Sequence, residues 1–292
     1  EIANYLQKMK DYELAQKSTN QTLADKLWMK NVAHVVGGKE QVENDQFSFF
    51  MNQFRDVIQD TFYGAKVETF SKASSSEIQL IAAVRLSQLF KEGISLLSYF
   101  GHSSATQMGF NLGDPASYDN QGKYPFFFVS GCTAGNNYIY DTLRIIQNSM
   151  SISENFVLSK DRGSIGFFAS THFGIPQYLG TYDDTLYREM SALNYGNSIA
   201  SDIQNTIMKV GGNNPSIDPF TRMNMEEMNL HGDPAMRINP HAKPDYVIEE
   251  PQVKINPQFI SIAARNFVMD AKAYNIGKAI SDSITFEVKR TY

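Results

Sequence analysis

Three uninterrupted apolar runs constrain the fold of this chain more than any other feature. They are ISLLSYF (94–100), YPFFFVS (124–130) and GSIGFFAS (163–170), and segments with helical periodicity lie between them. A strand that is apolar at consecutive positions is buried on both faces, and alternation of such strands with helices is typical of a parallel sheet. The sequence therefore predicts an α/β fold, with a mostly parallel sheet and helices on both faces.

Capping patterns indicate where several of the helices begin. We expect Asp45 to cap a helix, Ser74 and Glu77 to form a capping box, and Ser153 to cap a short helix over 153–160. The helix after Asp45 has one continuous apolar face, which predicts that this face packs on the sheet. The residues of that face are Phe47, Phe50, Met51, Phe54 and Ile58.

The character of the sequence changes near residue 240. Proline and charged residues are frequent after this point, and 284–289 alternate strictly between apolar and polar side chains. Such alternation is typical of an antiparallel strand with one exposed face. We therefore expect an α/β domain over 1–239, followed over 240–292 by a small or truncated β-sandwich module.

Composition excludes several classes of protein. The chain of 292 residues has a formal net charge of −5 and no dense run of Lys or Arg, which argues against a nucleic-acid partner. Its apolar runs are all too short to cross a membrane.

The given sequence begins directly with helical periodicity, with Ile2, Tyr5, Leu6 and Met9 on one face and no N-cap residue before them. We therefore expect the chain to be a piece of a longer protein.

Two chemically active residues follow two of the buried strands. His102 stands in YFGHSS just after the first apolar run, and Cys132, the only cysteine, stands in VSGC after the second. The carboxyl ends of parallel strands lie at the same edge of a sheet, where ligands bind in open α/β folds. If the two strands are neighbours, the imidazole and the thiol share one cleft.

This pair of side chains suits nucleophilic catalysis. An imidazole can take the proton of a thiol and later protonate a leaving amine. The flanking residues Gly101 and Gly131 leave room for a ligand to approach the backbone, whose N–H groups can hold an oxyanion. The alternative stays open that His102 is an ordinary loop histidine and Cys132 a packing residue.

Taken together, these segments resemble the gingipain family of cysteine peptidases, family C25, which has a caspase-like fold. The resemblance rests on LLSYFGHSS, YPFFFVSGCTAG, DRGSIGFFAST (161–171) and LHGDPAMRI (230–238), in that order, and covers residues 1 to about 239. It implies that Cys132 is the nucleophile and His102 the general acid–base. It also implies an acyl-enzyme and an oxyanion hole at the backbone of Gly101, Ser103, Gly131 and Cys132.

The resemblance also has one departure. The family usually has glycine after the histidine, whereas this chain has Ser103, which puts catalytic competence in question. The third acidic residue of the family is not identified by the pattern. Glu68, on an upstream predicted strand, is a candidate, with a solvated surface glutamate as the alternative.

Residues after the third buried strand are candidates for a substrate pocket. Ser170, Thr171 and His172 follow that strand and should lie at the same edge as His102, although His172 can equally be a plain loop residue. Asp233, before a proline, is expected to have a structural role in a turn. No cluster with metal-ligand spacing occurs, so we expect no cofactor or metal, with calcium on scattered loop oxygens left open.

Two subfamilies compete within the resemblance. One comprises endopeptidases that cut after a basic residue. The other comprises the sortases of the bacterial type IX secretion system, which remove a C-terminal signal and transfer cargo to a surface anchor. SGCTAG and the segment 153–171 are more similar to the second group. This implies a polypeptide substrate, outer-membrane secretion partners, an extracellular or outer-membrane location and an Ig-like module after the peptidase domain. A plain secreted endopeptidase and an inactive surface scaffold remain as alternatives.

Overall fold

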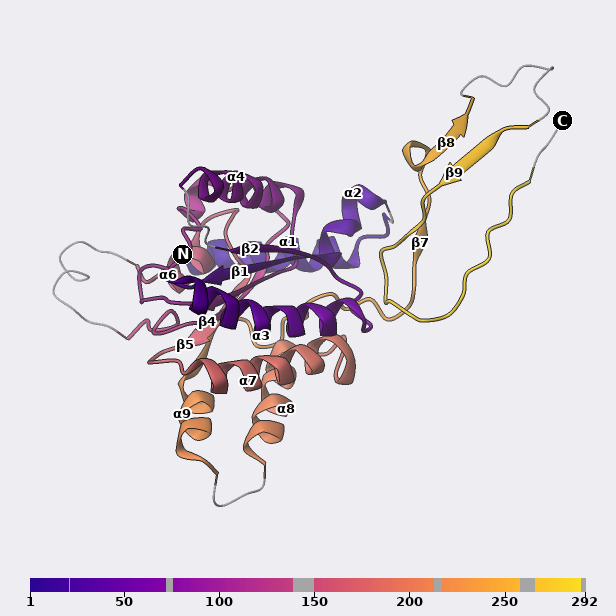
Figure 1. The fold of residues 1–292 in the computed structure, drawn as a ribbon. Coiled ribbons are helices and arrows are strands. Elements are labelled where there is room, and N and C mark those ends of the chain that lie inside the picture. Colours follow the sequence, from indigo (N-terminus) through magenta and orange to yellow (C-terminus); the bar gives the residue numbers. More distant parts are fainter. Residues whose placement is uncertain (21, 72–75, 139–149, 213–216, 258–265, 290–292) are drawn as a thin grey trace.

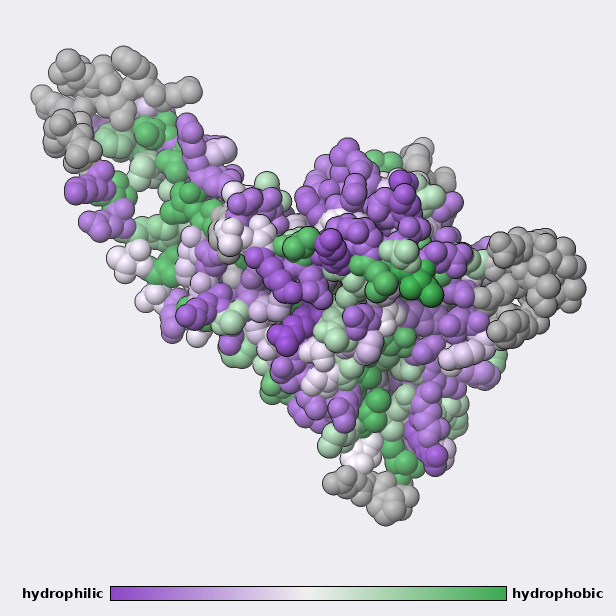
Figure 2. All heavy atoms as spheres, turned by 180° about the vertical axis from the view of Figure 1, so that it is seen from behind, coloured by the Kyte–Doolittle hydropathy of each residue, from purple (hydrophilic) through white to green (hydrophobic). Residues whose placement is uncertain are grey.

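A computed structural model describes residues 1–20, 22–71, 76–138, 150–212, 217–257 and 266–289. Its body is a sheet with helices on both sides, and a narrow arm of the C-terminal region extends away from that body (Figure 1). Seen from behind, the surface is mostly hydrophilic, with hydrophobic residues in separate patches (Figure 2). Among the described residues, no helix combines the length and the apolar composition that crossing a membrane requires.

A six-stranded sheet forms the centre, in the order β2-β1-β3-β4-β5-β6. Five strands run parallel, and β6 alone in this sheet is antiparallel to its neighbour β5. The prediction of a mostly parallel sheet is therefore confirmed. The strands are β1 (Asn31–Gly37), β2 (Lys66–Ser71), β3 (Leu96–Gly101), β4 (Phe126–Ser130), β5 (Gly166–Ser170) and β6 (Met228–Gly232).

Alternating side chains of these strands divide the core into two parts. Phe126 and Phe128 of β4 face one cluster, while Phe127 and Val129 face the other. Helices α3 and α7 cover the first face, and α4 and α6 cover the second (Figure 1). The apolar runs are thus buried on both faces, as predicted. The helices are α1 (Ile2–Lys17), α2 (Leu23–Lys26), α3 (Gln41–Gln59), α4 (Ser76–Glu92), α6 (Ile152–Leu158), α7 (Pro176–Arg188), α8 (Ile199–Gly211) and α9 (Pro219–Glu227).

The apolar face predicted for α3 is buried at all five positions. Its rings surround Phe100 of β3, with the ring centroids of Phe50 and Phe100 5.2 Å apart. The predicted cap was wrong, because the helix begins earlier and is capped by Glu40 in a capping box with Glu43. Glutamate at this position supplies the same carboxylate acceptor as aspartate, so the box forms without a typical capping residue.

Two other expectations about helix starts also change. Ser151, not Ser153, caps α6, because Ser151 with Glu154 makes a complete capping box. Ser74 lies outside the described residues. In α1, Ile2 and Leu6 are exposed, so the face predicted there was wrong in part. The buried stripe instead includes Lys8, whose Nζ donates to the carbonyl oxygens of Val157 (3.0 Å) and Arg162 (2.6 Å).

The C-terminal region holds two small antiparallel sheets. One pairs β7 (Tyr246–Val247) with β10 (Tyr274–Asn275), and the other pairs β8 (Val253–Asn256) with β9 (Val268–Ala271). The strand predicted over 284–289 does not form, and Ile284, Phe286 and Val288 are exposed. An alternating segment becomes a strand only where a neighbouring strand satisfies its backbone, and these residues pair with no strand in the described part of the chain.

Asp202 makes the stability of the fold depend on pH. It is 5% exposed, accepts a hydrogen bond from Asn194 Nδ2 (2.8 Å), and burial raises its pKa to about 7. A raised folded-state pKa means that the folded state holds the proton more tightly, so stability falls as pH rises from about 4 to about 7. We expect Asp202→Asn to remove this decline, a difference on the order of 4 kcal/mol across the window.

Urea unfolding of both proteins at pH 4.5 and pH 8 measures this difference. The wild type should lose stability relative to Asp202→Asn between the two values. Parallel pH profiles for the two proteins would show that Asp202 does not carry the effect.

Candidate active site

His102 and Cys132 follow neighbouring parallel strands. β3 ends at Gly101 and β4 at Ser130, and the two strands pair in register, with Phe100 opposite Ser130. His102 is therefore the first residue after its strand and Cys132 the second after its own. Both stand at the carboxyl edge of the sheet, where the sequence places them.

Close backbone packing explains the two glycines before these residues. A Cβ on Gly101 would lie 2.6 Å from the backbone of Gly37 on the adjacent strand, and a Cβ on Gly131 would lie 2.3 Å from Ser103 Oγ. Neither distance is tolerated by a real side chain. Glycine at 131 thus lets the loop of Cys132 approach Ser103, and glycine at 101 lets β3 lie close to β1 just before His102.

A direct hydrogen bond joins these two loops. Ser103 Oγ donates to the carbonyl oxygen of Cys132 at 2.8 Å, and Ser103 itself is half-buried. The residue that departs from the family's usual glycine therefore contacts the loop of the candidate nucleophile. Its side chain is accommodated by the missing Cβ of Gly131.

The carboxylate beside His102 is Glu43. His102 Nε2 lies 3.1 Å from Glu43 Oε1, and the ring of Phe47, one turn further along α3, packs edge-on against the imidazole. An ionised carboxylate only accepts hydrogen bonds, so Nε2 carries the proton in this pair and Nδ1 is left as the basic nitrogen.

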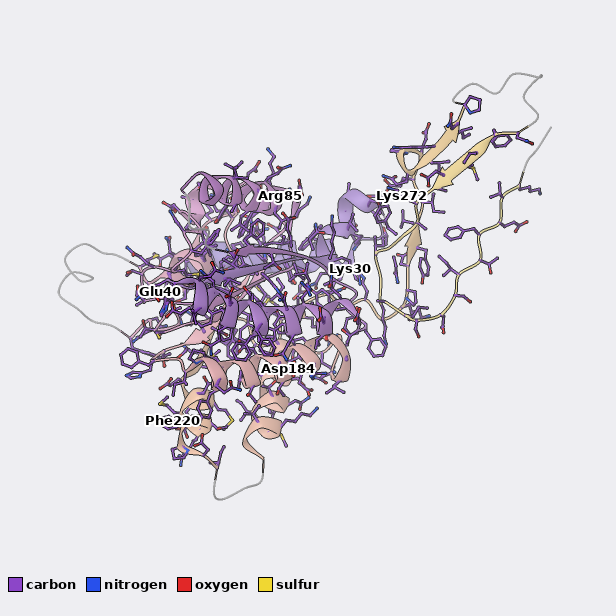
Figure 3. The ribbon with its side chains drawn as sticks, viewed as in Figure 1. Lys30, Glu40, Arg85, Asp184, Phe220 and Lys272 are labelled. Atoms are coloured by element: carbon purple, nitrogen blue, oxygen red, sulfur yellow. The ribbon has the colours of Figure 1, made fainter. Side chains whose placement is uncertain are left out.

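The predicted acidic partner, Glu68, is engaged elsewhere. Arg85 Nε and Nη2 donate to its two carboxylate oxygens at 2.8 and 2.9 Å. Arg85 lies on α4, across the sheet from the start of α3, which Glu40 marks in Figure 3. Glu68 is therefore held by a bidentate ion pair and is not the carboxylate that contacts His102.

Glu43 also belongs to the capping box of α3. Its Oε2 accepts from the N–H of Lys39 at 2.8 Å, and this bond, followed by the one from His102, lowers the pKa of the carboxyl group. Glu43 therefore stays ionised at neutral pH. The spacing of Glu40 and Glu43, directly after the strand that ends in Gly37, is the sequence signal that could have located this partner.

Three hydrogen bonds fix the backbone of His102. Its N–H donates to Gly37 O (3.0 Å), and its carbonyl oxygen accepts from Gly109 N (2.7 Å) and from the Tyr99 hydroxyl. A Cβ on Gly37 would overlap that hydroxyl, so glycine is needed there as well. These bonds fix the main chain from which the imidazole projects.

The residues after β5 adjoin the cysteine loop. Thr133 N donates to His172 O (2.7 Å), and Gly135 N donates to Ser170 O (2.9 Å). Thr171 and His172 thus form a wall next to the Cys132 loop, whereas the predicted pocket residue Ser170 is the last residue of β5 and is only 1% exposed, so it is not part of this surface. This arrangement follows from β4 and β5 being parallel neighbours.

Glu227 completes this wall, and the sequence pattern did not point to it. Its carbonyl oxygen accepts from Thr171 N (2.8 Å), and its carboxylate lies 3.6 Å from His172 Nδ1. Burial raises the pKa of Glu227, opposed by His172 and by the Ser170 hydroxyl. The His172 side chain is 60% exposed and that of Glu227 15%, so the wall presents an imidazole to solvent above a covered carboxylate.

Two other polar residues, His34 and Asp233, have structural contacts. His34 is buried, and its Nε2 pairs with the Tyr187 hydroxyl at 2.9 Å. Asp233 accepts from Ala235 N at 2.8 Å, as expected for a turn. In the described part of the chain, no group of three or more His, Cys, Asp or Glu side chains is arranged to hold a metal ion.

Comparison with known proteins gives a consistent result. The model of peptidase family C25 matches residues 1–239. No curated protein sequence matches the chain. The solved structure of gingipain R (RGPB), an Arg-specific cysteine proteinase, is similar with a TM-score of 0.58 at 14% identity, and the match covers 86% of this chain and 58% of that one.

Two further structures are similar over the same extent. A structure described as a protease has a TM-score of 0.60 at 13% identity and covers 86% of this chain and 59% of its own. A complex of the RgpB pro- and mature domains from Porphyromonas gingivalis has a TM-score of 0.55 at 16% identity, with 85% and 58% covered. At these identities the likeness is one of fold, and this chain spans under two thirds of each matched chain.

Proposed function

Because the chain belongs to peptidase family C25, we propose that it is a cysteine peptidase in which Cys132 is the nucleophile and His102 the general acid–base. The observation that carries this proposal is the geometry at the sheet edge. His102 and Cys132 follow paired strands, Ser103 bonds the two loops together, and Glu43 orients the imidazole.

The proposed reaction proceeds through an acyl-enzyme. With Nε2–H donated to Glu43, His102 Nδ1 takes the proton of the Cys132 thiol, and the thiolate attacks the scissile carbonyl carbon. The tetrahedral intermediate then collapses, the C–N bond breaks, and the imidazolium gives its proton to the leaving amine. Water, deprotonated by His102, attacks the thioester and releases the new carboxylate with the free thiol.

Backbone N–H groups supply the oxyanion hole in this proposal. The Thr133 N–H donates to His172 O, and we assign the N–H groups of Ser103 and Cys132 as the donors, since both lie just past the ends of the paired strands. Gly131 contributes by allowing the Cys132 loop to approach Ser103, and Gly101 by allowing β3 to lie close to Gly37 of β1. Donors held by a rigid backbone stabilise the developing negative charge without reorganising.

We assign substrate recognition to the wall after β5. Thr171 and His172 adjoin the cysteine loop and are backed by Glu227, while the buried Ser170 supports them by donating to His172 O. A polypeptide bound along the edge would place a side chain against this wall, since the wall lies one residue from Cys132.

We further propose a transpeptidase of the sortase type that acts on the C-terminal signals of secreted cargo. The resemblance of SGCTAG and of 153–171 to the type IX secretion group supports this, with a bacterial outer-membrane surface as the location and an Ig-like module over 240–292 after a peptidase domain over 1–239. Mass spectrometry of cargo C-termini distinguishes the reactions, because transfer leaves an added mass and hydrolysis leaves a bare carboxylate.

Ser103 favours one alternative, a scaffold that retains the peptidase fold without catalysis. Alkylation with iodoacetamide at neutral pH, followed by peptide mass spectrometry, separates the two functions. A peptidase should label rapidly at Cys132, and His102→Ala should slow this labelling at least tenfold, since the imidazole no longer accepts the thiol proton. An inert thiol in the folded protein would favour the scaffold.

A further inference from the structure

We infer that the hydroxyl group of Ser103 positions the nucleophile, by fixing the peptide group between Cys132 and Thr133. This inference rests on the proposed peptidase function and adds a role for a side chain that the family pattern does not contain. Ser103 is here a positioning residue, because its hydroxyl contacts the backbone of Cys132 and no reacting atom.

The Cys132–Thr133 peptide is held from both sides. Its carbonyl oxygen accepts from Ser103 Oγ at 2.8 Å, and its N–H donates to His172 O at 2.7 Å. The first bond comes from the loop after β3 and the second from the loop after β5. Rotation of this peptide would break both bonds, so the carbonyl, the N–H and the Cα of Cys132 have one orientation.

This orientation needs support because Thr133 is strained. Its φ is +56°, in the left-handed region, where a β-branched side chain is rarely found. Such a conformation is unfavourable and persists where surrounding contacts determine it. The bonds from Ser103 and to His172 are the contacts made by the peptide group directly before Thr133.

Backbone hydrogen bonds fix the position of Ser103. It forms an antiparallel bridge with Met108, flanked by the bonds Ser104 N to Gln107 O (2.8 Å) and Gly109 N to His102 O (2.7 Å). The same short hairpin therefore carries His102 and the donor that reaches Cys132. A displacement of one catalytic loop is transmitted to the other through the Ser103 hydroxyl.

Removal of the hydroxyl should affect turnover more than substrate binding. We expect Ser103→Ala and Ser103→Gly to lower kcat about fivefold with KM changed less than twofold, since a hydrogen bond that positions the nucleophile is lost. Ser103→Thr retains the donor and should recover at least half of the wild-type kcat. Ser159→Ala, which removes an exposed hydroxyl that bonds Asn155 O, is the matched control and should match wild type.

The experiment measures hydrolysis of a peptide chosen from the cleavage products of unfolded casein, together with the rate of Cys132 alkylation by iodoacetamide. Wild-type kcat in both Ser103→Ala and Ser103→Gly would overturn the inference, as would equal losses in Ser103→Thr and Ser103→Ala. Cys132→Ala is assayed in parallel. Activity retained by Cys132→Ala refutes the peptidase proposal itself, whereas an inactive Cys132→Ala with unaffected Ser103 variants refutes only the role of the hydroxyl.

Discussion

Cys132→Ala is expected to lower peptide hydrolysis at least 1,000-fold, to the level of a blank without enzyme. The thiolate forms the covalent acyl-enzyme in the proposed mechanism, and alanine offers no nucleophile in its place. A loss of this size corresponds to about 4 kcal/mol of transition-state stabilisation. Release of labelled fragments from unfolded casein, followed over hours, measures it.

The fold itself should tolerate this change. Cys132 is half-buried, and alanine fits the space of the thiol, so the melting temperature should shift by no more than a few degrees. An active Cys132→Ala protein would contradict the assignment of the nucleophile. A variant that binds a cleavage-product peptide but does not cut its parent sequence would support it.

Glu43→Gln is expected to lower kcat/KM about 100-fold, the second-largest effect. The carboxylate accepts the Nε2 proton of His102 at 3.1 Å and so leaves Nδ1 free as the base. An amide nitrogen facing His102 would instead need an acceptor, which favours the opposite tautomer. The effect should be smaller than in a fully buried triad, because 36% of the Glu43 side chain is exposed and solvent screens the interaction.

Glu68→Gln is the matched control, because it makes the same chemical change at the carboxylate predicted from the sequence. It removes one charge from the ion pair with Arg85, which is partly exposed, and should change stability by less than about 1 kcal/mol with activity unaffected. If Glu68→Gln lost more activity than Glu43→Gln, the assignment of the acidic partner would be reversed.

The local sequence pattern by itself determined that the central strands are buried and parallel. Runs of apolar residues such as FFFVS can only be buried on both faces, and the helices between them force the strands parallel. From this, the placement of His102 and Cys132 at one edge follows without any knowledge of side-chain packing. The same reasoning failed at 284–289, because alternation along one segment does not supply the partner strand that a sheet requires.

The contacts that complete the site were decided by the tertiary structure. Glu43 and His102 are 59 residues apart in the sequence. They come together because three phenylalanine rings of α3 pack against Phe100 and bring the start of the helix to the sheet edge; these are Phe47, Phe50 and Phe54. Ser103 reaches Cys132 only because Gly131 lacks a Cβ. Periodicity predicts whether a segment is buried. Which side chains from different segments contact each other depends on how those segments pack, and this is decided only by the tertiary structure.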